Sequence, residues 1–103
     1  MKRIAIFASG NGSNFQVIAE QFKVHFVFSD HRDAFVLKRA ETLGVPAYAF
    51  ELKEFADKQA YEQALIDLLD KHQIDLVVLA GYMKIVGPTL LAKYEGRIIN
   101  IHP

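Results

Sequence analysis

Five stretches of the chain are apolar over nearly their whole length. Four are clear, at residues 3–8, 24–29, 76–80 and 97–102, and a weaker one lies at 47–50. They are rich in Ile, Val, Leu and Phe and lack the polar–apolar alternation that marks a strand with one face in water. The pattern therefore predicts strands of a parallel sheet that is covered on both faces.

Apolar residues at helical spacing occupy the intervals between these runs. Asp33 is an expected N-cap for a helix over 34–43, Asp57 is one for a helix that ends near His72, and a short helix follows Pro88. The expected apolar face of the longest helix is formed by Tyr61, Ala64, Leu65, Leu68 and Leu69.

Strands and helices thus alternate along the chain, so the fold class is α/β. Right-handed crossovers then give an open parallel sheet with helices on both faces, a Rossmann-like arrangement. The 103 residues, with 51% hydrophobic content, suffice for one core, and we expect a single domain over 1–103. Ligands of such sheets bind beyond the carboxyl ends of the strands, which makes 9–14, 30–33, 81–87 and 100–103 the candidate segments.

Composition narrows the classes of function. Lys and Arg number 12 and Asp and Glu number 12, so the chain lacks the diffuse positive charge that attracts nucleic acid or anionic membranes. It has no cysteine, which excludes disulfides and thiolate chemistry. Its longest apolar run, 76–83, is far shorter than the roughly 18 residues of a membrane span, and its first residues do not resemble a signal peptide. We expect a cytoplasmic protein that binds neither nucleic acid nor membrane.

The turn between the first strand and the first helix reads ASGNGSN at residues 8–14. Gly10 and Gly12 permit close approach of a ligand, and a helix that begins near Ser13 offers unpaired N–H groups and the positive end of its dipole. These features are typical of a phosphate-binding turn. The alternative is a tight connection in which Ser13 or Asn14 is merely an N-cap.

Two known phosphate motifs do not fit this turn. A P-loop ends in Gly-Lys-Ser/Thr, and the dinucleotide fingerprint has a third glycine where this chain has Phe15. Asp30 nevertheless ends the second strand about 20 residues after the turn, where a ribose-binding carboxylate would lie. A monophosphate is the expected ligand, and a dinucleotide is the alternative.

Asn100 and His102 alternate with isoleucines at the end of the last strand, so their side chains point to one face. Together they suit acyl or formyl transfer, because an Asn amide can donate to a developing oxyanion and an imidazole can exchange the proton of an attacking amine. The alternative is a solvated strand end. The other histidines lack the spacing of metal ligands, and we expect no metal.

Four loop motifs, ASGNGSNFQ, FSDHRDA, LAGYMKIVGP and GRIINIHP, occur in this order and at these separations. Together they resemble the phosphoribosylglycinamide formyltransferases, over essentially all 103 residues. The resemblance implies transfer of a formyl group from 10-formyltetrahydrofolate to the amine of glycinamide ribonucleotide in purine biosynthesis. That ribonucleotide carries one phosphate, which agrees with the ligand expected at the glycine-rich turn.

The resemblance also implies roles for individual residues. Asn100 would steady the oxyanion formed when the amine attacks the formyl carbon, and His102 would help stabilise it and relay protons. The main chain of Gly12, Ser13 and Asn14 would hold the substrate phosphate. The remaining implied contacts are Gly81 to the substrate, and Lys58, Met83, Lys84, Ile85, Val86 and Asn100 to the folate.

Some of these folate contacts have a structural alternative or depart from the family's pattern. Met83, Ile85 and Val86 would also suit an ordinary core. Lys58 and Lys84 stand where the family often has arginine, and lysine lacks the planar fork of arginine.

The family's sequence continues beyond Asn-x-His-Pro to a catalytic aspartate and further strands, whereas this chain ends at Pro103. We therefore expect the N-terminal, phosphate-binding part of a formyltransferase domain, inactive alone, whose last strand favours self-association. Two alternatives stay open. One is a stand-alone dinucleotide-binding module, and the other is a different folate-dependent formyltransferase or a formyltetrahydrofolate deformylase.

Overall fold

The computed structural model describes residues 2–101, which form an alternating series of strands and helices. The strands are β1 (Ile4–Phe7), β2 (Phe26–Ser29), β3 (Ala47–Ala49), β4 (Leu76–Ala80) and β5 (Ile98–Ile101). The helices are α1 (Ser13–Gln21), α2 (Phe35–Leu43), the 3-10 turn η1 (Leu52–Glu54), α3 (Lys58–Lys71) and α4 (Pro88–Lys93).

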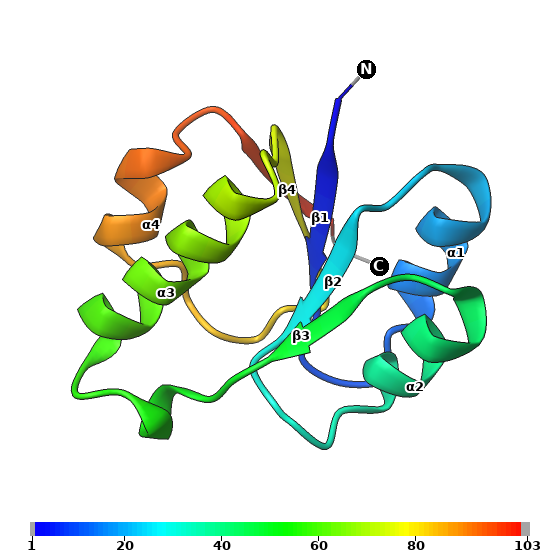
Figure 1. Ribbon diagram of the computed structural model, residues 1–103, viewed down its shortest axis with the longest axis horizontal. Helices are drawn as coiled ribbons and strands as arrows, with labels where there is room; N and C mark the ends of the chain where they lie inside the picture. The colour runs from blue at the N-terminus through cyan, green and yellow to red at the C-terminus, as the bar shows by residue number, and fades with distance from the viewer. Residues whose placement is uncertain (1, 102–103) are drawn as a thin grey trace.

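The strands form one parallel sheet in the order β3-β2-β1-β4-β5. Figure 1 shows α1 and α2 on one side of the sheet and α3 and α4 on the other. The predicted α/β class, with an open parallel sheet and helices on both faces, is confirmed. Among residues 2–101, no helix is long and apolar enough to cross a membrane.

Each face of the sheet has its own apolar core, which explains why the strands lack polar alternation. Toward α3 and α4, Phe7 and Phe28 pack with Tyr61 in a cluster rich in aromatic rings. Toward α1 and α2, Ile6 and Phe15 belong to a second buried cluster. Successive residues of a strand thus enter different cores, and both must be apolar.

The two predicted helix caps have different outcomes. Asp57 caps α3 as expected, because its Oδ1 accepts a hydrogen bond from Ala60 N at 2.8 Å. The prediction for Asp33 is wrong, since α2 begins at Phe35 with Ala34 in the N-cap position. A turn closed by Ala34 N and His31 O, 3.2 Å apart, displaces the helix start by one residue.

The strand order places a topological switch point between β1 and β4. The chain leaves β1 toward α1 on one face and leaves β4 toward α4 on the other, so the two loops diverge beyond the carboxyl ends of neighbouring strands. Such divergence opens a crevice at the carboxyl ends of the strands. The candidate site therefore lies between residues 9–14 and 81–87.

Candidate functional site

Ser9 joins the two loops of the crevice. Its backbone N–H donates to Gly81 O at 3.0 Å, and its Oγ accepts a hydrogen bond from Met83 N at 2.8 Å. Ser9 is 5% exposed. The sequence pattern places Ser9 in the turn but gives no sign of this connection, which spans 74 residues of chain.

A cavity of about 280 Å³ lies between the loops. It brings together the predicted phosphate-binding turn, Gly81 and Met83. Its lining residues are Gly10, Asn11, Gly12, Ser13, Asn14, Ala80, Gly81 and Met83.

The start of α1 favours an anion over a simple capped turn. Gly12 holds the N-cap position with φ 81°, and within the described part of the chain no side chain caps the helix. The alternative in which Ser13 or Asn14 is merely an N-cap is therefore wrong. The first N–H groups of this nine-residue helix lack a side-chain cap, beside the cavity and at the positive end of the helix dipole.

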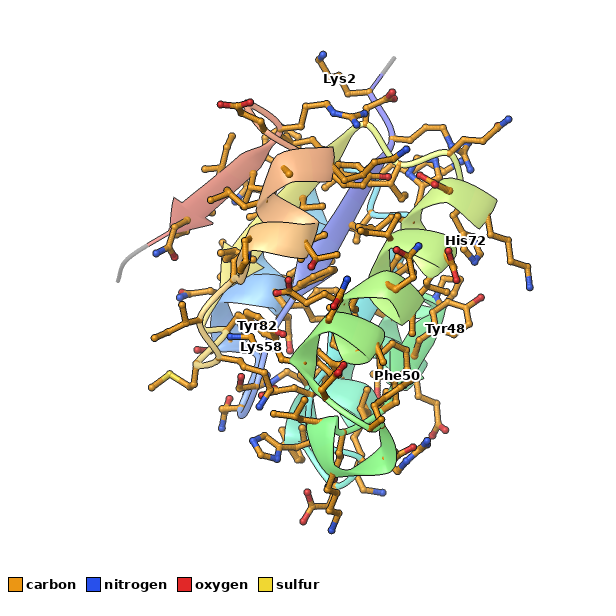
Figure 2. The ribbon with its side chains drawn as sticks, turned by 90° about the vertical axis from the view of Figure 1, so that its left-hand side faces the viewer. Lys2, Tyr48, Phe50, Lys58, His72 and Tyr82 are labelled. Carbon is orange, nitrogen blue, oxygen red and sulfur yellow. The ribbon has the colours of Figure 1, made fainter. Side chains whose placement is uncertain are left out.

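The loop after β4 presents apolar side chains to solvent. Met83 and Ile85 are each 80% exposed, so the alternative that both are ordinary core is wrong, whereas Val86 packs against the core. Lys58, at the start of α3, donates from Nζ to Ile85 O at 2.6 Å. Figure 2 labels Lys58, at the start of α3, and Tyr82, which belongs to this loop.

Lys84 of the same loop turns inward. Its Nζ lies 3.7 Å from Asp30 Oδ2 and 5.8 Å from the centre of the Tyr61 ring. Tyr61 in turn shares a hydrogen bond of 2.7 Å with Tyr82, and burial raises the pKa of both hydroxyls. Lys84 thus links the loop to a buried polar cluster and is 24% exposed at its side chain.

Asp30 lies at the carboxyl end of β2 and is 3% exposed. Its Oδ2 is 3.7 Å from both Lys84 Nζ and His31 Nε2, and its Oδ1 has no hydrogen-bond partner among the described residues. A carboxylate that binds ribose must be accessible. The burial of Asp30 therefore argues against the dinucleotide alternative, as does Phe15, which fills the core where the fingerprint has glycine.

Glu62 is a buried acid that the sequence pattern did not single out. It is 2% exposed on α3, and its carboxylate accepts hydrogen bonds from Gly87 N at 2.5 Å and Leu90 N at 3.0 Å. These contacts anchor the end of the 81–87 loop and the start of α4. The available signal in the sequence was that Glu62 directly follows Tyr61, at the edge of the apolar face of this helix.

Asn100 lies on β5 in register with Leu79 of β4, at the carboxyl edge of the sheet. Alternation puts it on the same face as Ile98, which packs against the cluster under α3 and α4. This is also the face on which Tyr82 and Val86 pack. His102 lies outside the described residues.

One group within residues 2–101 has the geometry of a metal site. Ligand atoms of His31, Asp33 and Glu51 lie within 4.8 Å of one another, with His31 and Asp33 exposed. Glu51 already accepts a hydrogen bond from Arg32 N at 3.0 Å and lies 3.4 Å from Lys53 Nζ. Its carboxylate is thus engaged by other groups.

A larger cavity, about 450 Å³, lies at the amino ends of β1 and β2, opposite the crevice. Burial, with the nearby cations Arg3 and Lys23, lowers the pKa of His25. Ligands of open α/β sheets bind at the carboxyl ends of strands, so the smaller cavity is the stronger candidate. The lining residues of the larger one are Lys2, Arg3, Ile4, Phe22, Lys23 and His25.

A model of the formyl transferase family matches residues 2–103. The chain belongs to the formyl transferase family. The phosphoribosylglycinamide formyltransferase of Bacillus subtilis (strain 168) is 46% identical over 110 residues, which cover 100% of this chain and 56% of that protein. The enzyme of the same name from Escherichia coli (strain K12) is 40% identical over 107 residues, covering 97% of this chain and 50% of that protein.

Solved structures agree with this family. The phosphoribosylglycinamide formyltransferase from Streptococcus pneumoniae TIGR4 has a TM-score of 0.98 and 76% identity, covering 99% of this chain and 57% of that chain. Glycinamide ribonucleotide transformylase 1 from Geobacillus kaustophilus has a TM-score of 0.93 and 44% identity, covering 100% of this chain and 58% of that chain. The chain thus spans about half the length of the curated relatives that it matches.

The formyl transferase fold brings most of the candidate residues to one edge of the sheet. Gly12, Ser13, Asn14, Gly81 and Met83 line one cavity. Ile85 is exposed on the adjoining loop, and Lys58 bonds to its carbonyl. Asn100 lies near the carboxyl end of β5, the strand next to β4. Lys84 and Val86 face inward, toward Asp30 and the core respectively.

Proposed function

We propose that this chain belongs to a glycinamide ribonucleotide formyltransferase. It would transfer a formyl group from 10-formyltetrahydrofolate to the amine of the ribonucleotide. The observation that carries the proposal is the cavity in which the turn at residues 12–14 faces Gly81 and Met83. Membership of the formyl transferase family supports the type of reaction.

The substrate phosphate would bind at the start of α1. Main-chain N–H groups of Gly12, Ser13 and Asn14 are the proposed donors, with the Ser13 and Asn14 side chains assisting. Gly12 lets a ligand approach the backbone closely, and the helix dipole favours negative charge at this point. One such cradle suits a monophosphate better than a pyrophosphate.

The folate would lie along the loop after β4. Met83 and Ile85 offer exposed apolar surface beside Gly81, which fits a flat heterocyclic ring. Val86 would close the apolar wall, and Lys58 would hold the loop through Ile85 O. Lys84 would contribute mainly through its position between Asp30 and Tyr61.

The chemistry would take place near Asn100 at the end of β5. The substrate amine attacks the formyl carbon and forms a C–N bond, which gives a tetrahedral species, and the bond between that carbon and the folate nitrogen breaks when this species collapses. Asn100 donates to the oxyanion of the tetrahedral species. His102 takes the proton from the attacking amine and returns one to the departing folate nitrogen, so that protons balance. No metal takes part in this scheme.

The proposed partners are small molecules, and the proposed setting is cytoplasmic. For residues 1–103 by themselves, self-association through β5 is a further part of the proposal, because β5 lies at an edge of the described sheet and Ile99 is 49% exposed. Nucleic acid is not among the proposed ligands, given the formal net charge of +0.

A titration with matched ligands tests the phosphate site. Glycinamide ribonucleotide is expected to shift the backbone amide NMR signals of residues 10–14, because the phosphate accepts from that main chain. The same riboside without its phosphate is the control and should leave these signals in place. Equal shifts with both ligands, or shifts confined to other segments, would contradict the proposal.

A further inference from the structure

The glycine-rich turn is held from outside by Arg39 of α2. Arg39 donates from Nε to Asn11 O at 2.7 Å and from Nη2 to Asn11 Oδ1 at 2.5 Å. Its Nη1 donates to Gln16 Oε1, on α1, at 2.5 Å. One guanidinium thus joins α2 to both the turn and the helix that follows it.

Other contacts of α2 support the same part of the turn. Val36 N donates to Gly10 O at 3.0 Å, which also satisfies an N–H in the first turn of α2, a helix that no side chain among residues 2–101 caps. A Cβ placed on Gly12 would lie 2.9 Å from the Cα of Val36 and overlap its side chain. The turn therefore rests directly on α2, with Arg39 one helical turn beyond Val36.

The geometry of these bonds requires a guanidinium. Three donors of one planar group reach acceptors on two residues, whereas a lysine ammonium is a point charge on a flexible stem. The Phe35 ring lies 5.0 Å from Arg39 Cζ and helps to fix the plane of the guanidinium. Arg39 itself is half-buried.

A phosphate-binding turn built on glycines needs such support. Gly10 and Gly12 leave the unbound backbone many conformations, and binding through main-chain N–H groups requires one of them. Bonds made before the ligand arrives reduce the entropy lost on binding.

We propose that Arg39 is a positioning residue for the phosphate-binding turn. Through Asn11 and Gln16 it holds the main chain of residues 10–13 in the conformation that receives the phosphate of a ribonucleotide. The inference rests on the proposed function. It assigns to Arg39 no contact with the phosphate, and it makes the shape of the guanidinium, rather than its charge, the essential property.

Steady-state kinetics of the full-length protein test this role. Arg39→Lys keeps the charge and Arg39→Met removes it, and both are expected to raise the KM for glycinamide ribonucleotide about tenfold. The kcat and the KM for the folate should stay within about twofold, because the proposed folate contacts lie in other segments than the turn. Lys38→Met, on the neighbouring exposed residue of α2, is the matched control and should behave like the wild type.

A double-mutant cycle with Asn11→Ala tests the route of the effect. If Arg39 acts through Asn11, adding Arg39→Met to Asn11→Ala should raise the KM by clearly less than the tenfold expected in the wild-type background. Gln16 would account for the remainder. Additive effects would overturn the proposed route.

Three further results of these measurements would overturn the inference or the proposed function. A wild-type KM in Arg39→Lys with a raised KM in Arg39→Met would show that charge matters and would overturn the inference. So would equal increases in both KM values together with a large fall in Tm, which would indicate a purely structural role. Wild-type protein that treats the ribonucleotide and its dephosphorylated riboside alike would instead overturn the proposed function.

Discussion

Gly12 illustrates how much of the candidate site depends on a single missing side chain. It adopts φ 81° and lies against Val36, so its conformation and its surroundings both exclude a Cβ. A Cβ on Gly10, two residues earlier, would meet no atom of the described residues within 4 Å, and Gly10 has no positive φ. Two glycines of one turn thus serve different purposes, and substitutions separate them.

We expect Gly12→Ala to lower the free energy of unfolding by about 2 kcal/mol or more, because backbone strain and overlap with Val36 add. It should also abolish binding of the ribonucleotide by displacing the start of α1. Urea unfolding and the NMR titration measure the two effects. Gly10→Ala is the matched control and should cost less than about 1 kcal/mol. Equal losses in both variants would contradict this role of Gly12.

At the scale of elements, Glu62 joins α3 to α4 and to the end of the 81–87 loop. Its carboxylate accepts from Gly87 N and Leu90 N, two donors that helix α4 leaves unpaired at its first turn. A Cβ on Gly87 would lie 2.8 Å from Glu62 Oε1, so the chain passes closely over the carboxylate. Glu62 thus caps the start of α4 from a different helix, whereas Asp57 caps α3 from the residue that directly precedes it.

Glu62→Ala should therefore destabilise the protein by about 3 kcal/mol, since it leaves two buried donors unsatisfied. Hydrogen exchange should also quicken at residues 85–91, because this segment loses its anchor. The control is Gln63→Ala, on an exposed residue of the same helix, which we expect to change stability by less than about 0.5 kcal/mol. Unchanged exchange in Glu62→Ala would show that the loop is held by other contacts.

At the scale of the whole molecule, buried tyrosine hydroxyls make the free energy of unfolding depend on pH in the alkaline range. Burial, and then a hydrogen bond to Asp70 Oδ1, raises the pKa of Tyr94 to about 12 from the ordinary tyrosine value of 10.0. Burial likewise raises the pKa values of Tyr61 and Tyr82, which share a hydrogen bond. The native protein thus holds protons that the unfolded chain releases.

The contribution of these tyrosines to the free energy of unfolding should consequently be constant below pH 10 and should fall between pH 10 and pH 12. In this window the unfolded chain ionises its tyrosines while the native protein keeps Tyr94 neutral. Urea unfolding across this range, with tyrosinate absorbance recorded for native and denatured protein, measures the effect. A native absorbance titration centred on pH 10 for all the tyrosines would contradict it.

Much of the fold follows from the sequence, because the sheet, the helix starts and the local caps depend on residues that are close together along the chain. The continuous apolar runs required a sheet covered on both faces, and Phe7 and Ile6 indeed enter opposite cores. The motif at residues 8–14 predicted a helix that begins near Ser13, and α1 does begin there, with Gly12 at the N-cap position. Asp57 could be recognised as a cap because its partner is three residues away.

The tertiary structure decided what depends on partners far along the chain. It replaced the expected Asp33 cap of α2 with a bond from Val36 to Gly10, and it paired Arg39 with Asn11, 28 residues earlier. It also turned Lys84 inward to Asp30, while Met83 and Ile85 stayed in solvent. Sequence patterns report periodicity and local capping, whereas a buried polar contact exists only after packing has excluded water and brought distant segments together.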